Sequence, residues 1–209
     1  MLTIANIAVF IHEMRLGDAQ LLDFVNKYAV VPGSFMSGEV PFPGKFISLF
    51  TSMFMHADIL HLAGNMWFLW IFGDAVEGAL GRFRFLFLYV VFGITASLIH
   101  ILSAPALAIP TLGASGALSG VMGAFLVMFP LSRVRMLFLL IIYPIFFEIH
   151  AIILLGLWIA WQISSVWHAP VSETLASGGI AWWAHIGGFA AGFLTALFSG
   201  KKNKVKKRK

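Results

Sequence analysis

The sequence contains no cysteine, and only 11% of its 209 residues are charged. The absence of cysteine excludes disulfide scaffolds, thiolate zinc sites, iron–sulfur ligation and cysteine nucleophiles. Hydrophobic residues make up 60% of the chain, whereas a soluble domain has about 45–50% apolar and about 25% charged residues. The composition therefore predicts an integral membrane protein with a single domain.

Positive charge is concentrated at the C-terminal end. Seven of the fourteen Lys and Arg residues lie within residues 201–209. A basic segment can bind nucleic acid, but directly after an apolar segment it is typical of a cytoplasmic tail attracted to anionic lipids. We therefore expect a membrane domain over residues 1–200, a basic cytoplasmic tail over residues 201–209, and no nucleic-acid partner.

Six apolar segments are candidates for membrane-spanning helices. A helix needs about 20 residues to cross the hydrocarbon core, so the first segment is short for a span. We therefore expect a first helix that is truncated at its N-terminus. Pro144 interrupts the long apolar run before the fifth segment, and we expect residues 134–149 to be irregular or interfacial. The six segments are residues 1–11, 58–77, 83–103, 113–131, 150–167 and 180–199.

The distribution of Lys and Arg predicts the orientation of these spans. With both termini cytoplasmic, eleven basic residues face the cytoplasm, and Arg15, Lys27 and Lys45 face outward. Basic loop residues favour the cytoplasmic side, so we predict six spans with both termini inside. The first loop, residues 12–57, then faces outward and contains Pro-Gly turn signals, and we expect it to be partly structured.

Three polar clusters are predicted to lie at one depth, in the outer half of the membrane. Polar groups inside a membrane are costly and often mark functional sites. His61 and Asn65 lie four residues apart on one helical face, and on their own they could simply hold helices together. The clusters contain His56, His61 and Asn65 on the second span, Gly113, Ser115 and Gly116 on the fourth, and His185 on the sixth.

Small residues spaced four apart predict a close contact between the fourth and sixth spans. Gly116 and Gly120 have this spacing in one, and Gly188 and Gly192 have it in the other. Such stripes let helix backbones touch. If these two spans form a pair, the side chains of Ser115 and His185 come within hydrogen-bonding distance.

The clustered residues supply the groups that acyl transfer requires. A serine hydroxyl needs a base to become a good nucleophile, and His185 is the candidate base for Ser115. The candidate donors to an oxyanion are the backbone N–H of Ser115 and the side chains of His61 and Asn65. Because no carboxylate lies at this depth near His185, we predict a Ser–His dyad rather than a triad. This chemistry requires no metal and no cofactor, and the sequence has no His-Glu-x-x-His motif.

The motifs resemble those of the rhomboid family of intramembrane serine proteases. The spacing of His56, His61 and Asn65 is the family's spacing, Gly-Ala-Ser-Gly at 113–116 resembles its nucleophile motif, and Ala-His-Ile-Gly-Gly at 184–188 resembles its base motif. The resemblance covers nearly the whole chain. It implies an all-α membrane protein that forms a six-helix bundle. In this bundle the catalytic residues would be supported by His56, Gly113, Gly116 and Gly188.

The resemblance also implies what the protein acts on and where. It implies cleavage of peptide bonds in or near transmembrane segments of other proteins, in a bacterial-type inner membrane, with the site open to the outer side and covered by a mobile loop at about residues 168–179. Many bacterial members carry an aromatic residue four positions after the nucleophile, where this chain has Ser119. The alternative is a catalytically silent family member that binds membrane clients, although silent members typically lack the serine or the histidine.

Overall fold

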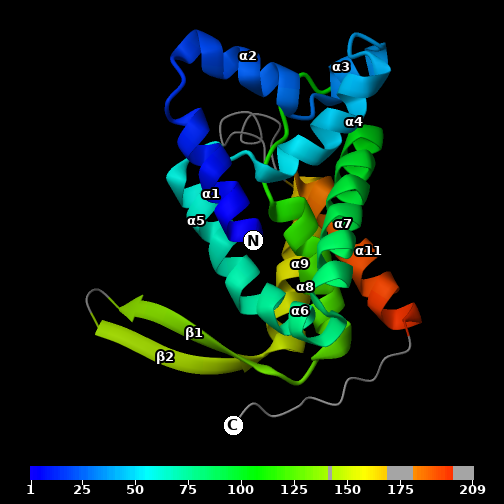
Figure 1. Cartoon of the computed structure of the whole chain (residues 1–209). Helices are drawn as coiled ribbons and strands as arrows, with labels where there is room; N and C mark the ends of the chain where they lie inside the picture. Colours follow the sequence, from blue (N-terminus) through cyan, green and yellow to red (C-terminus); the bar gives the residue numbers. More distant parts are fainter. Residues whose placement is uncertain (141–142, 169–180, 200–209) are drawn as a thin grey trace.

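The computed structural model describes residues 1–140, 143–168 and 181–199. Within these ranges the chain is mostly helical, and Figure 1 shows the longer helices side by side in a bundle, with shorter helices across one end. The helices of the bundle are α1 (Leu2–Glu13), α5 (Ile59–Phe68) continued by the π-helical turn η2 (Leu69–Gly73) and by α6 (Asp74–Leu80), α7 (Arg82–Ser103), α8 (Ser115–Met128), α9 (Ala151–His168) and α11 (Trp182–Phe198).

Each predicted span coincides with one helix or with a continuous helical run. Three of them, Ile59–Leu80, Arg82–Ser103 and Ala151–His168, are long and apolar enough to cross a membrane. The apolar helices α1, α8 and α11 have 12, 14 and 17 residues, which is about 18, 21 and 26 Å of helix. The number of spans and the side on which the termini lie therefore stay predictions.

Helix α8 forms the centre of the bundle. Every residue from Ala117 to Phe125 is buried, and α8 packs against both α7 and α11. A helix that is apolar on all sides is stable only when other helices surround it. The structure therefore holds the beginning of α8, where Ser115 lies, at a fixed place among its neighbours.

The first loop is partly structured, as predicted. It contains α2 (Asp18–Tyr28), α3 (Pro32–Ser37), α4 (Phe42–Thr51) and the 3-10 turn η1 (Ser52–Phe54). An antiparallel bridge joins Val30 to Thr111, and the N–H of Gly113 donates to the carbonyl of Ser52 at 2.8 Å. The loop is therefore fastened to the segment that leads into α8 (Figure 1).

Residues 133–140 and 143–150 form two paired strands, so the expectation of an irregular segment is wrong, and the described chain is not helical throughout. The alternative expectation, an interfacial segment, stays a prediction. Strand β1 (Arg133–Leu140) pairs with β2 (Tyr143–His150) in antiparallel register, with Arg133 opposite His150 and Leu139 opposite Pro144. A run rich in Val, Leu, Ile and Phe favours extended backbone. Pro144 is compatible with it because both strands of a two-stranded sheet are edge strands, where proline is tolerated.

Candidate active site

Glycine brings α8 and α11 into direct backbone contact. A Cβ atom on Gly188 would overlap the carbonyl oxygen of Gly116, and one on Gly192 would overlap that of Gly120. Only a hydrogen atom fits at these places, so the helices lie closer than larger side chains allow. The predicted contact between the fourth and sixth apolar segments is therefore present.

The same contact brings Ser115 and His185 together. Ser115 is the first residue of α8, and His185 lies in the first turn of α11. Ser115 Oγ lies 2.9 Å from His185 Nε2, and both residues are half-buried. When Nε2 is unprotonated, the serine hydroxyl donates a hydrogen bond to it. This is the arrangement in which an imidazole can take the proton of an attacking hydroxyl.

Gln162 on α9 is a third member of this group, which the sequence analysis missed. Its Oε1 lies 2.7 Å from His185 Nδ1, and the residue is only 2% exposed. With Nδ1–H donating to the amide oxygen, Nε2 is the ring nitrogen left free to accept from Ser115. A glutamine within an apolar segment was a signal that could have found it.

An aromatic ring from α9 also contacts His185. The centroid of the Trp158 ring lies 5.9 Å from that of the imidazole, at an interplanar angle of 38°. Trp158 is one helical turn before Gln162, so both project from the same side of α9. Ser119, in place of an aromatic residue on α8, instead donates to the carbonyl of Ser115 at 2.7 Å. The imidazole is therefore held by α9 rather than by α8.

His61 and Asn65 face the backbone immediately before Ser115. A Cβ on Gly113 would lie 2.8 Å from His61 Nε2 and 3.7 Å from Asn65 Nδ2, and the φ of Gly113 is +125°. Both the space and the backbone angle therefore require glycine there. Asn65 is 7% exposed, and within the described part of the chain its Nδ2 has no hydrogen-bond partner.

Two carboxylates hold the beginning of α5. Asp58 is its N-cap and accepts a hydrogen bond from the N–H of His61 at 2.8 Å, which satisfies one of the free donors at a helix start. Glu13 of α1, 5% exposed, accepts from the N–H of His56 at 3.2 Å. The rings of His56 and His61 meet edge to face at 5.2 Å. His56 thus lies beside His61, and Glu13 is a second residue that the sequence analysis missed.

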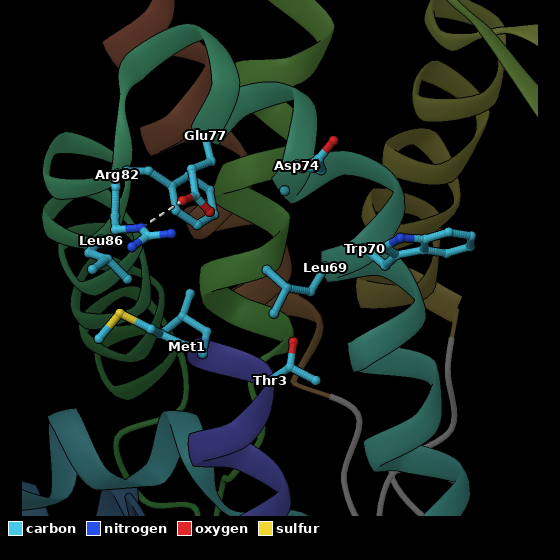
Figure 2. A pocket seen from close by; sticks show the side chains of 11 residues that line it. Met1, Thr3, Leu69, Trp70, Asp74, Glu77, Arg82 and Leu86 are labelled. Carbon is cyan, nitrogen blue, oxygen red and sulfur yellow. Dashed lines mark hydrogen bonds and ion pairs between the residues drawn. The ribbon is translucent and has the colours of Figure 1, made fainter.

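A separate hollow of about 200 Å³ lies near the other end of the bundle. Figure 2 shows it between the start of α1, the η2–α6 segment and the start of α7, beside the ion pair of Glu77 and Arg82. No serine, histidine or asparagine lines it. In the described ranges no three His, Asp or Glu side chains are grouped so that they could hold a metal ion. The predicted loop over the site and the basic tail lie outside the described residues.

Comparison with known proteins adds independent information. A family model described as the Rhomboid domain matches residues 43–202. Rhomboid protein 1, mitochondrial, of Saccharomyces cerevisiae is 32% identical over 85% of this chain and 47% of its own length. Rhomboid protease GluP of Bacillus subtilis is 34% identical over 75% of this chain and 27% of its own length. The human presenilin-associated rhomboid-like protein, mitochondrial, is 32% identical over 42% of this chain and 24% of its own length.

The matches cover only part of the length of each relative. The chain spans less than half the length of these relatives, so their activities and partners do not transfer with the match. Their names include mitochondrial proteins as well as a bacterial one. The expectation of a bacterial-type inner membrane is therefore not supported, whereas the family and the apolar helices indicate an integral membrane protein.

Proposed function

Because the chain belongs to the rhomboid family, we propose that it is an intramembrane serine endopeptidase that hydrolyses peptide bonds in or near the transmembrane segments of other proteins. The observation that carries the proposal is the 2.9 Å separation of Ser115 Oγ and His185 Nε2 at the meeting of α8 and α11. The retention of both residues argues against a silent, client-binding family member.

The proposed reaction uses these two side chains in sequence. Ser115 Oγ attacks the scissile carbonyl carbon while His185 Nε2 takes the hydroxyl proton. As the tetrahedral intermediate collapses, the C–N bond breaks and His185 returns the proton to the leaving amine. His185 then removes a proton from a water molecule, which attacks the acyl-enzyme, and the carboxylic product leaves as Ser115 regains its proton.

The oxyanion would be stabilised by donors gathered around Gly113. The N–H of Ser115 is the first of α8 and therefore has no partner within the helix. His61 and Asn65 approach the same segment from α5, so the three donors can converge on one oxygen. In this scheme Gln162 accepts from His185 Nδ1–H and holds the tautomer that the reaction needs.

The membrane arrangement is part of the proposal. Six spans with both termini inside would place Ser115 and His185 toward the outer side, because α8 and α11 both begin at that end. The substrates would then be transmembrane proteins that reach the site within the bilayer. Residues 201–209, with seven basic residues, would bind anionic lipid on the inner side.

Covalent labelling tests the proposed function. A fluorophosphonate probe should label the purified protein in detergent, and Ser115→Ala should remove the label, because the probe reacts only with an activated serine hydroxyl. Ser119→Ala is the matched control: it lies one turn further along α8, does not contact His185 and should keep the label. Equal labelling of wild type and Ser115→Ala, or no labelling of a wild-type protein that is folded, would refute the proposal.

Loss of the Gln162 amide should lower turnover. In Gln162→Leu, His185 keeps its contact with Trp158 but loses the acceptor for Nδ1–H. The loss of one buried hydrogen bond costs about 1–3 kcal/mol, which corresponds to a decrease in kcat of about five- to 150-fold. Cleavage of a fluorescent transmembrane substrate measures kcat and KM separately, and KM should stay unchanged.

Gln162→Glu keeps an acceptor oxygen at the same place and should retain more activity than Gln162→Leu. If the two variants lose activity equally, or if only KM rises, Gln162 does not position His185.

A further inference from the structure

The β1–β2 hairpin leaves the bundle and exposes apolar side chains. In Figure 1 it extends sideways from the end at which α8 finishes, opposite the end covered by α2 and α3. Large apolar side chains at the beginning of β2 are exposed, at 70% for Tyr143, 44% for Ile145, 63% for Phe146 and 47% for Phe147. We refer to these four residues as the β2 apolar patch.

The patch occupies both faces of the hairpin. Successive side chains of a strand point to opposite faces, so Phe146 lies on one face while Ile145 and Phe147 lie on the other. A hairpin between a core and water exposes one polar face, but from Met136 to Phe147 the sequence has no charged residue. Exposed apolar patches of this kind mark sites of interaction.

The charged residues of the hairpin are confined to its base. Arg133 and Arg135 each form an ion pair with Glu148, at 3.5 and 3.7 Å, and Val134 beside them is buried in the bundle. The hairpin thus has a polar base fixed to the helices and an apolar end directed away from them. A protein partner docked on one face would leave the other in water, whereas lipid can surround both.

The surroundings of the base match a membrane interface. Arg82 and Arg84 begin α7 at this end, and α11 finishes here, just before the seven basic residues of 201–209. Basic groups at a bundle end attract anionic headgroups.

The hydrogen-bonding edges of the hairpin limit how deep it can lie. Among the described residues the sheet has two strands, so each strand has one edge whose N–H and C=O groups have no described strand beside them. In hydrocarbon each unsatisfied group costs several kcal/mol. At the boundary between headgroups and acyl chains, water and phosphate oxygens satisfy these groups. We propose that the β1–β2 hairpin is a monotopic anchor, immersed about 5–10 Å into the boundary between headgroups and acyl chains of the leaflet at the α8 C-terminal end.

The absence of cysteine from the sequence allows a direct measurement of depth. Phe146→Cys and Phe147→Cys, on opposite faces, are each labelled with an environment-sensitive fluorophore and reconstituted in vesicles of phosphatidylcholine and phosphatidylglycerol. Both probes should show blue-shifted emission and stronger quenching by lipids spin-labelled near the headgroup than by lipids labelled near the chain end. This expectation does not depend on catalysis, so it can fail while the proposed protease activity stands.

Two control positions calibrate the measurement. Leu157→Cys, at a side chain 66% exposed in the middle of α9, should be quenched best by the deep label, and Ser37→Cys at the end of α3 should emit as in water. Water-like emission from either hairpin position overturns the proposal, as does deep quenching like that at Leu157. Emission that changes with the ratio of protein to lipid would instead mean that a second copy of the chain covers the patch.

Discussion

Ser115→Ala and His185→Ala should each lower the rate of substrate cleavage by at least about a thousandfold, the scale of loss when one member of a nucleophile–base pair is removed. Alanine at 115 leaves no atom to form the acyl-enzyme. Alanine at 185 leaves the hydroxyl without the base that lies 2.9 Å from it. The measurement is the initial rate with a fluorescent transmembrane substrate in detergent.

The double variant gives the sharper form of this prediction. If Ser115 and His185 act as one unit, removing the second residue after the first costs almost nothing more, because losses within a catalytic unit are far from additive. Ser115→Ala/His185→Ala should therefore be as slow as either single variant. Losses that multiply would show that the two side chains act independently, and full activity of either single variant would eliminate the dyad.

Gly192→Ala should destabilise the protein and also lower its activity. The added Cβ would overlap the carbonyl oxygen of Gly120, which is backbone and cannot rotate away, so α11 must move from α8. Overpacking of this kind costs about 1–3 kcal/mol. Because His185 is on α11, a displacement of about 1 Å should also slow cleavage by about a hundredfold.

Gly156→Ala is the matched control for this substitution. Gly156 lies within α9, and a Cβ there would meet nothing within 4 Å. The same change should therefore leave cleavage unaffected and stabilise the helix by about 0.4–1 kcal/mol, since alanine restricts the unfolded chain. The midpoint of thermal inactivation in detergent compares the two variants. Equal midpoints would mean that the contact between α8 and α11 is not close enough to exclude a methyl group.

The pairing of Ser115 with His185 was predictable because it depends on a local pattern. Small residues recur every four positions in both segments, and such stripes determine which helix faces touch. Gln162 and Glu13 were not predictable in this way. No periodicity in the sequence indicates the rotation of α9 or α1 against its neighbours, and this rotation brings the two side chains to His185 and His56.

Residues 133–150 show a different limit. An uninterrupted apolar run has no period that distinguishes a strand from a buried helix, and Pro144 was compatible with either an irregular segment or an edge strand. The hairpin followed from pairing between two halves of the run, in the register Arg133 to His150. The register of hydrogen bonds between two strands depends on which residues pair, and composition does not encode it.

The sequence by itself determined that the chain is a membrane protein and which six segments are helical, because hydrophobic content and helical spacing are properties of nearby residues. It also indicated that Ser115 and His185 come within hydrogen-bonding distance if the fourth and sixth segments pair, and the structure has them 2.9 Å apart. Only the tertiary structure showed that Gln162 and Trp158 hold the imidazole of His185. It also showed which side chains fix the start of α5, and that the apolar run after α8 folds into two paired strands. Those features depend on the angles and distances between packed elements, which are fixed only when the whole bundle has assembled.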